Sequence, residues 1–308
     1  MVSPAAKRAV AKDLVKRGRC SERKACELVE APRSMVRYKR RVKGDEAVLR
    51  KRIRRLADKH KRYGFRRILA LLRREGWRVN KKRVHRLWKE EGLQRKRKTK
   101  KKRACGPRAD VPVKAECPKH VWSYDFIEDR TERGGKLRML CILDEYTREC
   151  HHIRVERSMG ATKVIASLEW LFLLQGAPAY LRSDNGPELV AKALQAWLTE
   201  RGAKTIYITP GSPWENPYIE SFHDKFRDEC LNMHVFTDGR HAQNVAEAWR
   251  KEYNEERPHS SLDYMTPAEF AAHCRNCGRP TASLRSGNAK TPSTEQQPEA
   301  NTLTPVGT

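Results

Sequence analysis

Three acidic residues in the second half of the chain have residue types and local settings suited to binding a metal ion. Asp125 lies inside the apolar run WSYDF, Asp184 opens the sequence DNG, and Glu220 follows Asn216 and Pro217 in a run with helical character. Carboxylate oxygens are the ligands that Mg²⁺ requires. Each residue alone also has an ordinary explanation: a basic neighbour for Asp125, a turn for Asp184, or an exposed helix position for Glu220.

The sequence around these carboxylates predicts an α/β core with antiparallel and parallel strands in one sheet. The expected order is strand, strand, strand, helix, strand, helix, strand, helix, at residues 120–128, 136–146, 149–158, 161–175, 179–184, 188–202, 204–210 and 216–231. Asp125 should then lie mid-sheet, where an ionised carboxylate is rare unless it is paired or bound to a cation. Asp184 should lie at the carboxyl end of a strand, and Glu220 in the first turns of a helix packed across that edge.

The spacing of the three carboxylates is more specific than any one of them. Asp125 and Asp184 are separated by 58 residues, and Asp184 and Glu220 by 35. This D, D-35-E arrangement resembles the catalytic core shared by retroviral integrases and insertion-sequence transposases, and Arg227, seven residues past Glu220, matches the basic residue of that signature. The segments 60–68, 211–229 and 253–270 resemble the transposases encoded by the second reading frame of insertion-sequence family three. The resemblance covers about residues 6–272.

The resemblance implies an α/β RNase H-like catalytic core, a mixed sheet flanked by helices at residues 118–277, preceded by all-α helix-turn-helix domains. It implies DNA strand cleavage and strand transfer with two Mg²⁺ (or Mn²⁺) ions held by Asp125, Asp184 and Glu220. Two such ions about 4 Å apart stabilise both the attacking and the leaving oxygen at phosphorus. No covalent intermediate is needed, and Arg227, with Lys225 beside it, would hold phosphate near the metals.

The charge of the chain is concentrated in its first third. Residues 1–110 hold 41 of the 65 lysines and arginines but only 11 of the 38 aspartates and glutamates, so the remainder of the chain is close to neutral. A basic part joined to a near-neutral part indicates a polyanion-binding module attached to a unit with another task. The alternative for the charge alone is a ribosomal-type or merely solubilised protein.

Two tandem helical modules are predicted within the basic part, at residues 1–43 and 44–94. Each combines short helices with a tight turn, in a helix-turn-helix pattern. A flexible basic linker follows at residues 95–117, and residues 278–308 have the composition of a disordered tail. The candidate DNA contacts in these parts are Arg33, Arg37, Lys82, Arg83, Arg86, Arg95, Lys96, Arg97 and Lys98.

The chain departs from retroviral integrases in its amino-terminal part. Those proteins bind zinc there through His and Cys pairs, whereas residues 1–110 hold only two histidines and three cysteines at unsuitable spacing. The lone Cys274–Cys277 pair has no partner pair at zinc-ligand spacing and is interpreted as incidental. Trp214 could stack on a splayed base or pack against a helix start. Asn254 and His259 are interpreted as structural.

The sequence excludes a membrane or secreted protein, because it has no apolar run of about 18 residues and no secretory signal. The resemblance implies a bacterial cytoplasmic, nucleoid-associated protein whose partners are double-stranded DNA, further copies of itself in a synaptic complex, and an upstream-frame product. Two alternatives remain: an RNase H-like nuclease without strand transfer, for which Glu169 is the only acid available in the core helix, and a non-catalytic repressor.

Overall fold

A computed structural model of the chain describes residues 3–38, 44–94, 113–186, 188–189, 191–209 and 215–277. The predicted contacts Arg95, Lys96, Arg97 and Lys98, the linker up to residue 112, Trp214 and the tail lie outside these residues. The chain divides into two compact units, Met1–Leu56 and Ala57–Thr308. None of the described helices is long and apolar enough to cross a membrane.

The first unit contains the three short helices that the sequence predicts. They are α1 (Pro4–Lys16), α2 (Glu22–Leu28) and α3 (Arg33–Arg37). The Ser21 side chain accepts a hydrogen bond from the backbone N–H of Lys24 and so caps α2, as its position predicts. A small apolar cluster that includes Ala11, Ala25 and Val36 holds the three helices together.

Helix α4 (Glu46–Lys59) begins in the first unit and ends in the second, where α5 (Phe65–Arg74) and α6 (Lys81–Glu90) follow. Apolar residues at helical spacing were expected to face inward here, and Ile68, Leu69 and Leu72 of α5 and Val84, Leu87 and Trp88 of α6 are buried, whereas Phe65 is half-buried. The Asn80 side chain caps α6 by accepting from the N–H of Lys82 at 2.8 Å. Phe65 contacts His85 with ring centroids 4.3 Å apart, which joins α5 to α6.

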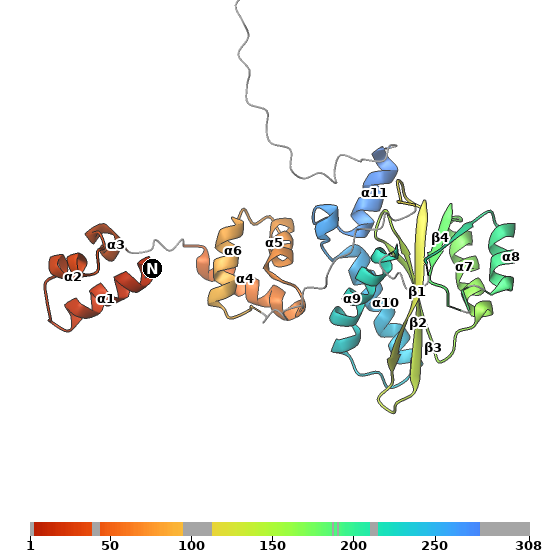
Figure 1. The fold of residues 1–308 in the computed structure, drawn as a ribbon, viewed down its shortest axis with the longest axis horizontal. Helices are drawn as coiled ribbons and strands as arrows, with labels where there is room; N and C mark the ends of the chain where they lie inside the picture. The colour runs from red at the N-terminus through yellow and green to blue at the C-terminus, as the bar shows by residue number, and fades with distance from the viewer. Residues whose placement is uncertain are drawn as a thin grey trace, which may run out of the picture. The chain divides into compact units, whose positions relative to one another are not determined.

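A five-stranded mixed sheet forms the core of the second unit (Figure 1). Its strands are β1 (Val121–Arg130), β2 (Lys136–Asp144), β3 (Cys150–Glu156), β4 (Tyr180–Ser183) and β5 (Lys204–Tyr207). The spatial order is β3-β2-β1-β4-β5, with β1–β2 and β2–β3 antiparallel and β1–β4 and β4–β5 parallel. The predicted mixed sheet flanked by helices is therefore confirmed, and β1, which carries Asp125, is its central strand.

Helices cover both faces of the sheet (Figure 1). Helices α7 (Ala161–Gln175) and α8 (Lys192–Glu200) pack on the face that includes Trp122 and Tyr124. Helices α9 (Pro217–Glu229) and α10 (Gly239–Glu255) pack on the other face, with Ile127. Since side chains alternate along a strand, Asp125 projects to the face covered by α9. The 3₁₀ turns η2 (Leu231–Met233) and η3 (Ser260–Leu262) and the helix α11 (Pro267–Cys277) complete the described chain.

Helix α10 lies in a segment for which the sequence analysis predicted no element, and it closes the outer edge of the sheet. The Asn254 amide accepts from the N–H of Cys150 and donates to its carbonyl, both at 2.9 Å. The Gln243 amide bonds the N–H of Val155 at 2.8 Å and the carbonyl of Ile153 at 2.9 Å. These amides satisfy backbone groups that an edge strand otherwise leaves unpaired. The predicted structural role of Asn254 is confirmed.

Two acidic residues at the end of β2 are buried and structural. Asp144 accepts hydrogen bonds from the backbone N–H groups of Tyr146 and Thr147, which closes the turn after the strand. Glu145 receives Nη1 of Arg182 at 2.9 and 3.0 Å from its two carboxylate oxygens, and both side chains are fully buried. The Ser123 hydroxyl also donates to Glu145. These contacts hold the end of β2 to β1 and β4, the strands that carry Asp125 and lead to Asp184.

Candidate active site

The three predicted carboxylates come from three different elements of the second unit. Asp125 lies at the middle of β1, opposite Cys141 of β2, and its Oδ1 accepts from the backbone N–H of Phe126 at 2.7 Å. Asp184 follows the last residue of β4 directly, as the sequence predicts. Glu220 lies in the first turn of α9. The helix packs on the sheet face rather than across its edge, because Ile219, Phe222 and Phe226 are buried there.

The DNG sequence shapes the turn that carries Asp184. Its Oδ1 accepts from the N–H of Gly186 at 3.1 Å, and the Asn185 amide donates to the carbonyl of Ile208 at 2.7 Å. A Cβ at residue 186 would lie 3.2 Å from Asp184 Oδ1, closer than ordinary van der Waals contact. Glycine at this position therefore leaves the carboxylate room to keep its orientation.

Asp125 lies within electrostatic reach of the other two carboxylates. Burial raises the pKa of Asp125 to about 7, the Phe126 N–H opposes the shift, and the negative charges of Asp184 and Glu220 raise it further. Burial, with the negative charge of Asp224, raises the pKa of Glu220. Ionising Asp125 beside these acids is therefore unfavourable in the metal-free protein, and a divalent cation would offset the repulsion.

The donor chemistry suits a hard divalent cation, since all three groups are carboxylates. Among the described residues, no three or more His, Cys, Asp or Glu side chains are gathered closely enough to hold a metal ion. Asp184 and Glu220 act on Asp125 electrostatically, but the three side chains would have to draw together around a cation.

His223 is a neighbour of Asp125 that the sequence analysis missed. Its Nδ1 lies 3.7 Å from Asp125 Oδ2, and it stands three residues after Glu220, on the same side of α9. Burial, with the nearby charge of Arg227, lowers the pKa of His223 to about 4, so the imidazole is neutral at physiological pH. The sequence feature that could have identified His223 is its position three residues after Glu220.

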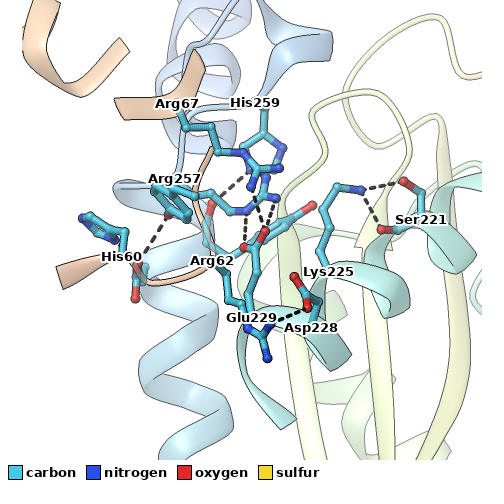
Figure 2. A network of polar contacts seen from close by, with 12 residues as sticks. His60, Arg62, Arg67, Ser221, Lys225, Asp228, Glu229, Arg257 and His259 are labelled. Carbon is cyan, nitrogen blue, oxygen red and sulfur yellow. Dashed lines mark hydrogen bonds and ion pairs between the residues drawn. The ribbon is translucent and has the colours of Figure 1, made fainter. Parts of the chain in front are cut away.

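The side chains of Arg227 and Lys225 leave α9 in different directions and have different partners. Arg227 donates to the carbonyl of Glu128 at 2.7 Å, lies 3.9 Å from the carboxylate of Asp129, and keeps 44% of its side chain exposed. Lys225 donates to the carbonyl and hydroxyl of Ser221 at 2.6 and 2.5 Å (Figure 2). Burial lowers the pKa of Lys225 to about 8. Arg227 therefore keeps an exposed guanidinium near the end of β1, whereas Lys225 is bonded within its own helix.

The predicted DNA contacts of the helical parts have mixed environments. Arg37 lies 2.6 Å from the Glu22 carboxylate and Arg33 lies 4.0 Å from it. On α6, Lys82 is exposed, whereas Arg83 and Arg86 are half-buried. Arg86 pairs with Glu90 at 2.9 Å. The assignment of these residues to DNA contacts stays a prediction.

Comparisons with known proteins place this arrangement in a family. Models described as "Integrase core domain" match residues 115–213 and 201–267, and one described as "HTH-like domain" matches residues 43–101. A protein of insertion element IS407 of Burkholderia multivorans is 40% identical over 255 residues, covering 83% of this chain and 92% of the relative. Transposase InsD of the Escherichia coli IS2 elements is 30% identical, covering 68% of this chain and 73% of the relative. The chain belongs to the insertion-element transposases with an integrase core.

Solved structures similar to this transposase include retroviral proteins. The catalytic core of HTLV-2 integrase in complex with magnesium is 16% identical, covers 51% of this chain and 99% of that one, and has a TM-score of 0.39. A chain of the simian T-cell lymphotropic virus intasome is 14% identical over 79% of this chain and 80% of that one, with a TM-score of 0.46.

The family assignment agrees with the described fold. The transposase has an integrase core built on the mixed sheet, and the HTH-like domain precedes it in the chain. The integrase core makes the transposase a polynucleotidyl transferase of the kind that uses divalent metal ions.

Proposed function

We propose that this transposase cuts and joins DNA strands at the ends of its insertion element, with Asp125, Asp184 and Glu220 binding two Mg²⁺ or Mn²⁺ ions. The observation that carries the proposal is the setting of Asp125, which is held by the Phe126 N–H on the α9 side of β1 and lies within electrostatic reach of Asp184 and Glu220; burial, with these two charges, raises its pKa to about 7. A carboxyl group that burial and neighbouring acids keep from ionising is suited to bind a divalent cation together with those acids.

The protein residues would orient the reacting groups. The Phe126 N–H holds one oxygen of Asp125, and the Gly186 N–H holds one oxygen of Asp184. Arg227 would hold a non-bridging phosphate oxygen. Bound divalent cations would activate a water or a 3′-hydroxyl and stabilise the charge at phosphorus. Each step breaks one P–O bond and forms another, so no protein nucleophile is required.

The environment of Glu169 weighs against the hydrolytic alternative. An RNase H relative without strand transfer needs a further acid in the core helix, and Glu169 is the acid available in α7. Its side chain is 47% exposed and pairs with Arg201, the residue directly after α8, 3.5 Å away. Helices α7 and α8 cover the sheet face opposite to the one that Asp125 faces, so Glu169 does not join the candidate site.

Strand transfer with a pre-cut DNA end tests the proposal directly. The full chain, with and without the upstream-frame product, is incubated with Mg²⁺, a labelled element end bearing a free 3′-hydroxyl, and a target duplex. Joined products are expected on a sequencing gel. Hydrolysis without joining would favour the nuclease, and binding without either reaction would favour the repressor.

Metal affinity is expected to depend on pH below about 7. Asp125 must lose its proton to coordinate a cation, and its pKa in the metal-free protein is about 7. Mn²⁺ affinity should therefore fall by up to about tenfold for each pH unit below that value and level off above it. Isothermal titration calorimetry between about pH 5.5 and pH 8.5 measures the profile, and constant affinity across this range would contradict the assignment.

We also propose that the helical parts bind the terminal inverted repeats, with phosphate contacts that include Arg33, Arg37, Lys82, Arg83 and Arg86. Duplex affinity should then fall linearly in log salt, with a slope of about −0.9 per phosphate contact. Lys82→Ala is expected to reduce the slope by about 0.9, as measured by fluorescence anisotropy. Lys192→Ala on α8 removes the same charge from the core and should leave the slope unchanged. Equal slopes for Lys82→Ala and wild type would contradict the contact.

Two DNA ends must be brought together for transposition, so we propose that copies of the chain assemble on DNA in a synaptic complex. We also propose that the transposase belongs to insertion-sequence family three and acts with the upstream-frame product. Its proposed location is the cytoplasm, in association with the nucleoid. The basic run at residues 95–103 would contribute further phosphate contacts through Arg95, Lys96, Arg97 and Lys98.

A further inference from the structure

Basic residues between positions 59 and 74 contact acidic residues at the ends of three core helices. We call this set of contacts the α5 dock. Its ion pairs are Lys59–Glu256 at 2.8 Å, Arg62–Asp228 at 3.3 Å, Arg67–Glu229 at 2.9 Å and Arg74–Glu269 at 2.5 Å, and His60 is hydrogen-bonded to Glu252 at 2.9 Å. The acidic partners lie at or after the ends of α9 and α10 and in the first turn of α11.

A carboxylate shared by two arginines forms the centre of the α5 dock (Figure 2). Glu229 accepts from Arg67 through Oε1, and from Arg257 through both oxygens at 2.6 and 2.7 Å. Arg257 is only 1% exposed. A buried guanidinium that lost its carboxylate would remain uncompensated, so this contact is much stronger than an ordinary surface ion pair.

A stacked pair of rings completes the α5 dock. The rings of His60 and Tyr63 lie 4.4 Å apart and nearly parallel, and both side chains reach Oε1 of Glu252, at 2.9 and 3.3 Å. His60 and Tyr63 are both buried. Since the ion pairs surround buried rings, the α5 dock is a packed interface and not a set of solvated charges.

The α5 dock connects two functional parts of the second unit. Arg67 belongs to α5, which packs against α6 of the HTH-like domain, and Glu229 is the last residue of α9, the helix whose first turn carries Glu220. We propose that the α5 dock fastens the HTH-like domain to the catalytic helix, so that DNA bound by α5 and α6 orders the helix that carries Glu220. The DNA step of this inference rests on the proposed function, whereas the fastening does not.

Arg67 and Arg78 are basic residues of the same domain with different environments. Arg67 is half-buried and bonded to Glu229, a buried carboxylate of the core, so its charge neutralises an acid of the α5 dock. Arg78, in the turn between α5 and α6, is exposed. Arg67 is therefore assigned a positioning role, and Arg78 provides a matched change of one positive charge in the same domain.

Hydrogen exchange of the full chain, followed by mass spectrometry, tests the fastening. Arg67→Ala is expected to raise exchange about tenfold in residues 217–229, as expected for the loss of a hydrogen bond between charged groups. Glu229→Gln should raise exchange in residues 60–67 reciprocally, and Arg78→Ala should change neither segment. The inference would be overturned if Arg67→Ala raised exchange only in residues 60–67 and Glu229→Gln raised it only in residues 217–229.

A second arm tests the coupling to DNA. A random-sequence duplex at low salt serves as the probe, at a concentration that saturates each protein. The duplex is expected to slow exchange in residues 217–229 of the wild type and of Arg78→Ala, but not in those of Arg67→Ala. Residues 65–90 should be protected by the duplex in all three proteins. Equal protection of residues 217–229 in Arg67→Ala would overturn the coupling. Failure of strand transfer alone would count against the proposed function and leave the fastening intact.

Discussion

Asp125→Asn is expected to lower the rates of strand cleavage and strand joining by on the order of 10³-fold or more, because it removes the central ligand charge of the candidate metal site. The substitution keeps the size of the side chain, and the amide oxygen can still accept from the Phe126 N–H. Gel assays of both steps, on element ends with Mg²⁺, measure the effect. Glu128→Gln is the matched control, since Glu128 is exposed on the same strand and pairs with Lys136.

The same substitution is expected to stabilise the metal-free protein at alkaline pH. The pKa of Asp125 is about 7 in the folded chain, against an ordinary value of 3.8 for an aspartate side chain. Between these values the unfolded chain has lost the proton and the folded chain has kept it, so wild-type stability falls as pH rises through this window. At pH 8, Asp125→Asn should therefore raise the free energy of unfolding by about 2–4 kcal/mol. An inactive variant with lower stability at pH 8 would point to misfolding instead of a lost ligand.

Arg182→Leu is expected to lower the free energy of unfolding of the core by about 3–5 kcal/mol. The substitution leaves the Glu145 carboxylate without its guanidinium, although both side chains are fully buried. Urea denaturation of the metal-free protein, followed by tryptophan fluorescence, measures the loss.

The paired substitution and a surface control isolate this effect. Adding Glu145→Leu to Arg182→Leu should recover part of the lost stability, because no buried charge then remains. Arg201→Leu breaks the exposed pair with Glu169 and should cost less than about 1 kcal/mol. A similar loss from Arg182→Leu and Arg201→Leu would refute the assignment of the buried pair.

Much of the local structure was predictable because its causes lie within a few residues. Ser21 and Asn80 cap the helices that follow them, since their side chains reach backbone N–H groups two or three residues away. The α10 helix was predictable and missed: Ala242, Ala246, Trp249 and Tyr253 are buried at helical spacing.

The sequence by itself determined the mixed sheet with its flanking helices, the central position of Asp125, and the spacing of three carboxylates that marks the family. These features follow from short-range periodicity and from residue order along the chain. Asp144 and Glu145, the acids at the end of the neighbouring strand, were not considered in the sequence analysis, and their partners in the structure are structural.

Only the tertiary structure decided which charges meet. His223 approaches Asp125 across 98 positions of the chain, and Arg67 reaches Glu229 across 162. Lys225 bonds Ser221 instead of extending beside Arg227, because it lies on another side of the helix. Such contacts depend on how helices pack on a sheet, and packing sums many weak interactions between residues distant in sequence, which no local pattern encodes.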